Sequence, residues 1–96
     1  MEQTNQTEEE EEYREAIRIN ENDIDAHNCL GLLLYDLGRY NESEQEHRKA
    51  IEIDPTRPCA HACLGQLLFT VWRFEEAAKE EDIANTLYKK ISNKIR

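Results

Sequence analysis

The stretch AHNCLGLLLYDLGRYNES at residues 26–43 is written a second time, as AHACLGQLLFTVWRFEEA, at residues 60–77. The two stretches begin 34 residues apart and share nine of eighteen aligned residues. Other positions keep their character, as in Tyr35 and its counterpart Phe69. A repeat of this length, with apolar residues at helical spacing, is typical of a duplicated pair of helices.

Apolar periodicity and capping residues predict five helices. The first lies before residues 26–43, and the second overlaps them. The first helix is expected from Glu8 to Ile19. The second is expected to follow a cap at Asn22 or Asp23, because these side chains accept hydrogen bonds from the free N–H groups of a first turn. It should reach Leu37.

Glycine, asparagine and proline set the boundaries of the middle of the chain. Gly38 is expected to end the second helix, because glycine readily adopts the left-handed conformation found there. Asn41 is expected to cap the third helix, with Glu44 three residues later completing a capping box. Pro55 ends that helix, because its ring cannot sit inside one.

The last two helices follow the same logic. The fourth should begin at Thr56 or Arg57, carry Pro58 in its first turn and reach about Thr70. The fifth should begin near Phe74 and continue almost to the end of the chain, since its apolar residues keep helical spacing. High contents of charged residues (34%) and few glycines and prolines agree with an all-helical chain.

The chain resembles the tetratricopeptide repeat (TPR) family. The matching residues of the first repeat are Leu30, Gly31, Leu34, Gly38, Tyr40, Ala50 and Pro55, and those of the second are Leu64, Gly65, Leu68, Phe74, Ala77 and Ala84. The resemblance implies an all-α fold, a right-handed α-solenoid of antiparallel helix pairs with about two and a half units. It divides the chain into a frayed polar tail (1–7) and a single domain (8–96), which comprises a partial repeat (8–23), two repeats (24–57 and 58–91) and the end of a capping helix (92–96).

Five positions depart from the family pattern, of which Ser43 replaces a small alanine without expected harm. His27 and His61 stand where a large residue is usual, and we expect them to be core histidines with satisfied hydrogen bonds. Trp72 replaces the glycine of the turn, which predicts an altered turn in the second repeat. Lys89 replaces the terminal proline, which predicts a last helix without a stop.

The resemblance also implies a concave groove that holds a peptide or a partner helix. The residues expected to line it are Asp25, Asn28, Leu32, Tyr35, Cys59, Ala62, Gln66 and Phe69. At 100° per residue they share one side of the first helix of each repeat. Leu32, Tyr35 and Phe69 would be apolar anchors, with Asn28 and Gln66 as polar contacts to a peptide backbone. The alternative is that the anchors pack against the chain's own C-terminal helix or another repeat.

The net charge of −9 argues against nucleic acid and against an anionic membrane surface, which both require basic protein faces. No stretch approaches the apolar length of a membrane span. No Lys or Arg is expected on the groove, so the predicted partner is a basic or apolar protein segment. Residues 1–25 carry a charge of −8 and residues 87–96 a charge of +4, which suggests a possible homo-oligomer formed through the open ends.

The remaining residue chemistry excludes several classes of function. Three cysteines among apolar residues predict no disulfide framework and a reducing, cytoplasmic compartment. Cys59, His61 and Cys63 fit no zinc pattern, so no metal or cofactor is predicted, and the cysteines are interpreted as small buried thiols. We find no nucleophile with an oriented base, so no enzyme activity is expected. The predicted function is a protein-interaction module, with a self-associating structural unit or a regulatory fragment of a larger protein as alternatives.

Overall fold

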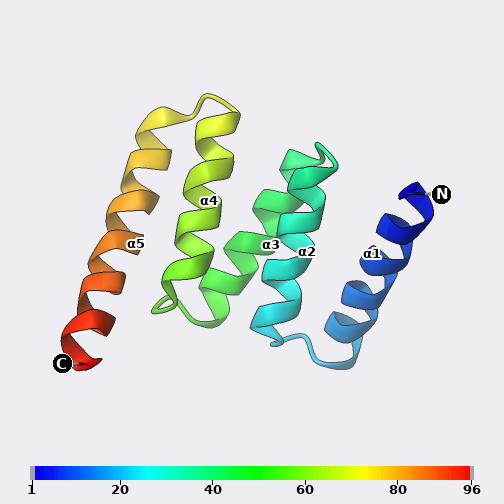
Figure 1. Cartoon of the computed structure of the whole chain (residues 1–96), viewed down its shortest axis with the longest axis horizontal. Coiled ribbons are helices and arrows are strands. Elements are labelled where there is room, and N and C mark those ends of the chain that lie inside the picture. The colour runs from blue at the N-terminus through cyan, green and yellow to red at the C-terminus, as the bar shows by residue number, and fades with distance from the viewer. Residues whose placement is uncertain (1, 96) are drawn as a thin grey trace.

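Five helices follow one another in the computed structural model, which describes residues 2–95, with side chains described for residues 8–94. They are α1 (Glu2–Ile19), α2 (Ile24–Asp36), α3 (Tyr40–Ile53), α4 (Pro58–Thr70) and α5 (Phe74–Ile95). Consecutive helices run antiparallel and pack on each other in a row, with α1 and α5 at opposite ends (Figure 1). No strand occurs among residues 2–95. The predicted all-α solenoid of antiparallel helix pairs is confirmed.

Helix α1 begins at Glu2, earlier than the expected start at Glu8, so most of the tail predicted to be frayed has helical backbone. Met1 lies outside the described residues. Glutamate and glutamine are good helix formers, and acidic side chains near a helix N-terminus complement its dipole. At the other end, α5 continues past Lys89 as predicted. No helix in residues 2–95 has both the length and the apolar character needed to cross a membrane.

The core is made by leucines of the first helix in each pair, packed against small residues of the second. The fully buried leucines are Leu30, Leu34, Leu64, Leu67 and Leu68, each at most 1% exposed. Burying one such side chain contributes roughly 1.5–3 kcal/mol. Ser43 and Ala50 on α3 are fully buried, and the Ser43 hydroxyl donates to the Gly31 carbonyl over 2.6 Å. Small side chains therefore let α2 and α3 approach closely.

The turn after α2 has the hydrogen bonds that the sequence predicts for a glycine-ended helix. Gly38 has a φ of 78°, and its N–H donates to the Tyr35 carbonyl over 3.0 Å. The next N–H, of Arg39, donates to the Leu34 carbonyl over 2.8 Å. This pair of bonds satisfies two carbonyls that would otherwise have no partner at the helix end.

The turn after α4 is the same turn, with Trp72 in the place of glycine. Trp72 has a φ of 70°, and its N–H donates to the Phe69 carbonyl over 3.1 Å. The Arg73 N–H donates to the Leu68 carbonyl over 2.8 Å. The prediction of an altered turn is therefore wrong. The repeated packing fixes the backbone path, and tryptophan is held in a left-handed conformation that costs about 1–2 kcal/mol for a residue with a Cβ.

Replacing Trp72 with glycine is expected to stabilise the fold by up to about 1 kcal/mol, because relief of the left-handed strain outweighs the greater entropy of glycine in the unfolded chain. The Trp72 side chain is 80% exposed, so little buried surface is lost. Urea unfolding followed by circular dichroism measures the change. The matched variant, Gly38→Ala, should be destabilised by about 1 kcal/mol. A destabilised Trp72→Gly variant would show that the ring contributes more packing than the strain costs.

Helix α3 starts differently from the prediction. Arg39 is its capping residue, and no side chain caps its first turn. The expected box between Asn41 and Glu44 does not form, because the turn leads directly into the helix and places Asn41 inside it. The Glu44 carboxylate instead accepts from Arg73 of the following turn, over 2.8 Å. By contrast, the predicted cap of α2 is confirmed at Asp23, which accepts from the N–H of Ala26.

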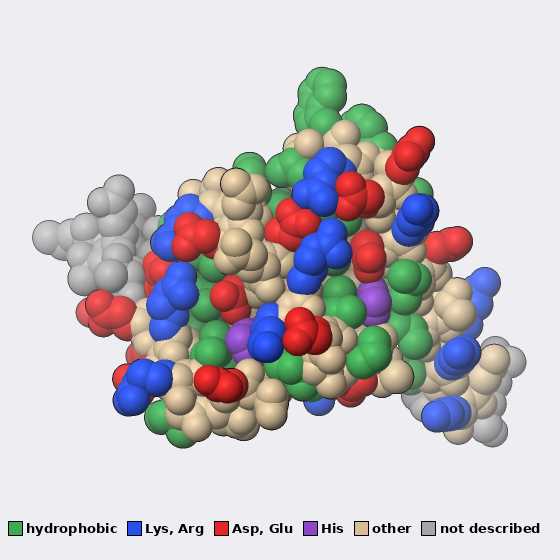
Figure 2. Space-filling model, turned by 180° about the vertical axis from the view of Figure 1, so that it is seen from behind, with side chains coloured by type: hydrophobic (Ala, Val, Ile, Leu, Met, Phe, Trp, Pro, Cys, Tyr) green, Lys and Arg blue, Asp and Glu red, His purple; other side chains and the backbone are tan. Residues whose placement is uncertain are grey.

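The turn inside each helix pair contains an arginine that forms an ion pair with the helix preceding that pair. Arg39 Nη1 lies 2.8 Å from Glu10 of α1, and Arg39 Nε lies 2.7 Å from Glu42. The hydrogen bonds from Arg39 lower the pKa of Glu10 and that of Glu42. The same ion pairs recur 34 residues later, where Arg73 pairs with Glu44 and with Glu76. Figure 2 shows basic and acidic side chains lying next to one another across this side of the molecule.

Candidate functional site

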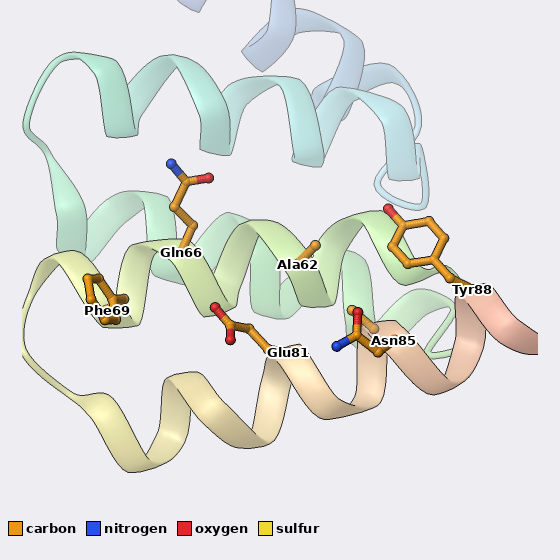
Figure 3. Close-up of a pocket in the computed structure, with 7 residues that line it drawn as sticks. Ala62, Gln66, Phe69, Glu81, Asn85 and Tyr88 are labelled. Carbon is orange, nitrogen blue, oxygen red and sulfur yellow. The ribbon is translucent and has the colours of Figure 1, made fainter.

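Two hollows flank α4, and most of the predicted groove residues line one or both. The inner groove, of about 120 Å³, lies between α2 and α4 and is lined by Leu32, Tyr35, Asp36, His47, Cys63 and Gln66. The end groove, of about 480 Å³, lies between α4 and α5 and is lined by Ala62, Gln66, Phe69, Glu81, Ala84, Asn85 and Tyr88. Gln66 lines both hollows. Figure 3 shows the end groove, with Phe69 and Tyr88 at its opposite ends.

The three remaining predicted residues line neither hollow. Asn28 is 7% exposed, and its amide oxygen accepts from His47 Nδ1 over 3.2 Å, so its side chain is engaged with α3. Cys59 is an exposed residue near the start of α4. Asp25 is exposed and lies 3.1 Å from Arg57 Nη1. An arginine thus stands beside the predicted face, which the sequence analysis had taken to carry no basic residue.

The three predicted anchors differ in what they contact. The Tyr35 hydroxyl lies 2.7 Å from Thr70 Oγ1, and its ring packs on the leucine cluster of α4 and on the Tyr40 ring at 5.4 Å. Tyr35 therefore serves mainly in packing between repeats, the alternative that the sequence had left open. Leu32 is 46% exposed and Phe69 is 61% exposed. These two side chains present free apolar surface.

Exposed aromatic rings gather where α4 turns into α5. The Phe69 and Phe74 rings meet edge to face, with centroids 5.1 Å apart, and the Trp72 ring lies 6.1 Å from that of Phe74. Trp72 is 80% exposed and Phe74 is 49% exposed. Aromatic rings that are held in place but not covered are favourable contact points for a partner, because they lose little conformational entropy on binding.

The two repeat histidines are buried and fully paired. His27 Nδ1 lies 2.8 Å from Glu46 Oε1, and its Nε2 lies 2.8 Å from the carbonyl of Glu21. His61 makes the equivalent pair with Glu80 at 2.7 Å and with the carbonyl of Pro55 at 2.9 Å. The prediction of core histidines with satisfied hydrogen bonds is confirmed. Because a carboxylate and a carbonyl only accept, each ring satisfies both neighbours when both of its nitrogens donate.

The cysteines are free thiols, as no disulfide joins them. Cys29 and Cys63 are half-buried, whereas Cys59 is exposed, so the expectation of buried thiols is wrong at Cys59. Burial raises the pKa of Cys63 to about 12, which keeps this thiol protonated and a poor nucleophile at neutral pH. Within the described part of the chain, no three His, Cys, Asp or Glu residues are grouped to hold a metal ion.

The α5 side of the end groove was missed by the sequence analysis. It consists of Glu81, Ala84, Asn85 and Tyr88. One period earlier stand His47, Ala50 and Ile51 of α3 and the following Asp54, and Ile51 packs against the leucines of α4. Applying the 34-residue period to the second helix of each pair, as well as to the first, would have identified these positions.

Helices paired at a constant period, with matching turns, ion pairs and histidine contacts, define a helical-repeat protein of the solenoid class. A comparison with protein families matches the TPR repeat over residues 11–38 and 32–71, and the chain belongs to this family. TPR repeats generally mediate protein–protein interaction. A comparison with curated proteins gives no significant match.

Solved structures share the fold. A crystal structure of MamA matches with a TM-score of 0.84 at 24% identity, covering 88% of this chain and 49% of that chain. A second MamA structure, designated MSR-1 C2, matches with a TM-score of 0.77 at 22% identity, covering 81% of this chain and 45% of the other. This chain thus spans about half the length of the MamA chains it matches. At this level of identity the likeness shows the fold alone.

Proposed function

We propose that this chain is a non-catalytic protein-interaction module that binds a peptide or helix of a partner protein along the inner groove. The observation that carries the proposal is the exposure of Leu32 on α2, which lines the inner groove together with Gln66 of α4, whereas Phe69 lies in the end groove. Covering an exposed leucine or phenylalanine contributes roughly 1.5–3 kcal/mol. Gln66 is exposed and offers a donor and an acceptor to a peptide backbone.

The charge around the groove supports a basic or apolar partner. Asp36 lines the inner groove itself, and Asp25 lies at the opposite end of the same helix. Arg57, beside Asp25, is paired with Asp25 and with Asp54, so it adds little positive potential. A basic side chain in the ligand would find an acidic rim, whereas an acidic segment would be repelled.

Substitution of Leu32 by aspartate is expected to weaken binding of a captured partner segment at least tenfold, because a charge would replace the apolar contact. The partner is first identified by pull-down with the wild-type chain, and its binding segment is then measured by fluorescence anisotropy. The matched control is Ile19→Asp, since Ile19 is also exposed, at 76%, but lies at the end of α1. Equal affinities of the Leu32→Asp and Ile19→Asp variants would contradict groove binding.

Two further statements belong to the same proposal. We place the protein in the cytoplasm, because three free thiols are compatible with a reducing compartment. Self-association is the second candidate function, favoured by the opposite charge of the two ends. The outer side of α1 carries Glu8, Glu11, Glu12 and Glu15, and the last turns of α5 carry Lys89, Lys90 and Lys94. Its test is included in the experiment below.

A further inference from the structure

The chain itself shows what covers the face of a completed helix pair. Helix α4 lies over the pair α2 and α3, where Tyr35 and Ile51 pack against its buried leucines Leu64, Leu67 and Leu68. His47 of α3, which contacts Asn28 of α2, is 1% exposed. A face built by one pair is therefore closed by the first helix of the next.

The equivalent face of the pair α4 and α5 is the end groove, and it is open. Phe69 stands 34 residues after Tyr35, and Phe74 stands 34 residues after Tyr40. The ring pair is preserved, with centroids 5.1 Å apart against 5.4 Å in the first repeat. Its two rings are nevertheless 61% and 49% exposed, and Tyr88 at the other end of the groove is 48% exposed. Among residues 8–94, six of the eight exposed large hydrophobic residues belong to α4, α5 or the turn between them.

The spacing of the groove residues matches two turns of a helix. Phe69 and Tyr88 lie at opposite ends of the groove, and Ala62 of α4 lies between them (Figure 3). Ala84 of α5 also lines the groove. Ala62 and Phe69 are seven residues apart on α4, which corresponds to about 10 Å along the helix axis. A helix with apolar residues at positions i and i+7, and a small residue between them, would contact both aromatic rings and fit over the alanines.

The charges along α5 define the direction and the polarity of such a helix. Its first half carries Glu81 inside the groove, and its last turns carry the exposed Lys89, which lies near the groove side of α5 at 100° per residue. Helix α4 runs antiparallel to α3, so a helix in the equivalent place would run antiparallel to α5. The start of that helix would then lie near Lys89, and its end would lie near Glu81.

We infer that the end groove is the docking site for an amphipathic helix of another protein that is acidic in its first turn and basic in its last turn. The helix occupies the place on α4 and α5 that α4 occupies on α2 and α3. This inference rests on the proposed function and names the kind of partner, but it uses a different groove. Charge complementarity and helix dipoles favour the same orientation, because acidic groups suit a helix start and basic groups suit a helix end.

The probe is a synthetic peptide with the sequence of residues 58–71, preceded by two glutamates and followed by two lysines, in reducing buffer. A second peptide has the lysines first and the glutamates last. Binding to the full chain is measured by fluorescence anisotropy, and the mass of the protein alone by analytical ultracentrifugation. We expect saturable binding of the first peptide and at least threefold weaker binding of the charge-exchanged one.

Variants separate the two grooves. Tyr88→Asp should weaken binding of the first peptide at least tenfold, whereas Leu32→Asp in the inner groove and Ile19→Asp at the far end should change it less than twofold. Glu81→Lys should invert the preference between the two peptides, since the groove charge near the helix end is reversed. Tyr88 and Glu81 are exposed, so these variants should fold, which circular dichroism checks.

Three results would overturn the inference. The first is no saturable binding of either peptide by the wild-type chain. The second is loss of binding in Leu32→Asp but not in Tyr88→Asp, which would assign the helix to the inner groove. The third is a wild-type dimer that Tyr88→Asp converts to a monomer, with no peptide bound by either, which would show that a second copy covers this face. Only the second result concerns the inner groove, and it supports the proposed function while the inference fails.

Discussion

Substitution of Gly31 by alanine is expected to destabilise the protein by about 2 kcal/mol, although alanine is the better helix former. A Cβ at position 31 would lie 2.7 Å from both Cε1 and Nε2 of His47. His47 is 1% exposed and its Nδ1 lies 3.2 Å from the Asn28 amide oxygen, so a shift of the ring would break a buried hydrogen bond. Overpacking of this kind costs about 1–3 kcal/mol or more, which outweighs the gain of up to about 1 kcal/mol in helix propensity.

The second repeat supplies the matched control, Gly65→Ala. There a Cβ would lie 3.2 Å from Cγ of Glu81, an exposed and flexible side chain that can move aside. We expect Gly65→Ala to change the free energy of unfolding by less than about 1 kcal/mol, in the stabilising direction if the glutamate moves freely. Urea unfolding of both variants and of Gly31→Ala with His47→Ala tests the cause. If the second substitution leaves the penalty of Gly31→Ala undiminished, the clash with His47 is not its source.

Acidification is expected to weaken the fold by up to about 3 kcal/mol through His47 alone. Burial lowers the pKa of His47 from 6.5 to about 4, because the charged ring would lose its hydration. The folded state therefore holds His47 neutral, and the unfolded state binds the extra proton first as the pH falls. The contribution of His47 to stability is complete above about pH 6.5 and is lost progressively down to about pH 4.

The measurement compares wild type with His47→Gln, because all other residues are the same in both proteins and their effects cancel in the difference. The amide of glutamine can still donate to the Asn28 carbonyl oxygen, which His47 contacts at 3.2 Å. Urea unfolding at pH 7 and at pH 4.5 should show a larger loss of stability for wild type, by about 2 kcal/mol. Equal losses in the two proteins would mean that His47 is not kept neutral by the fold.

Much of the fold was predictable because the same information is written twice. Gly38 and Pro55 predict where α2 and α3 end, and Asp23 caps α2 as its side chain predicts. The errors lie where tertiary contacts override local preference. Trp72 is held in a left-handed turn by the packing on either side, and Glu44 is drawn away from its own helix end by Arg73 of the next turn.

The site was predictable only in part, because exposure depends on the neighbouring helix and not on the residue itself. Tyr35 and Phe69 occupy the same register, yet α4 covers the first and nothing in residues 2–95 covers the second. Asn28 shares a helix face with Leu32, but its amide is turned to His47. A helical wheel predicts the direction in which a side chain points. The residues that surround the side chain lie 19 or 34 positions away in the sequence, and a helical wheel does not show them.

Each helix pair is joined to the helix before it by the same ion pairs, formed by an arginine in its turn. Glu10 on α1 receives Arg39, and Glu44 on α3 receives Arg73. Gene duplication could insert another unit of 34 residues after residue 57. The arginine of the new unit would then pair with Glu44, and its glutamate would pair with Arg73. Both new contacts between repeats would therefore have their ion pairs. Helix α5 has no equivalent glutamate to pair with the arginine of a further repeat, because Ala78 stands 34 residues after Glu44. The protein is thus suited to lengthening from within and not at this edge.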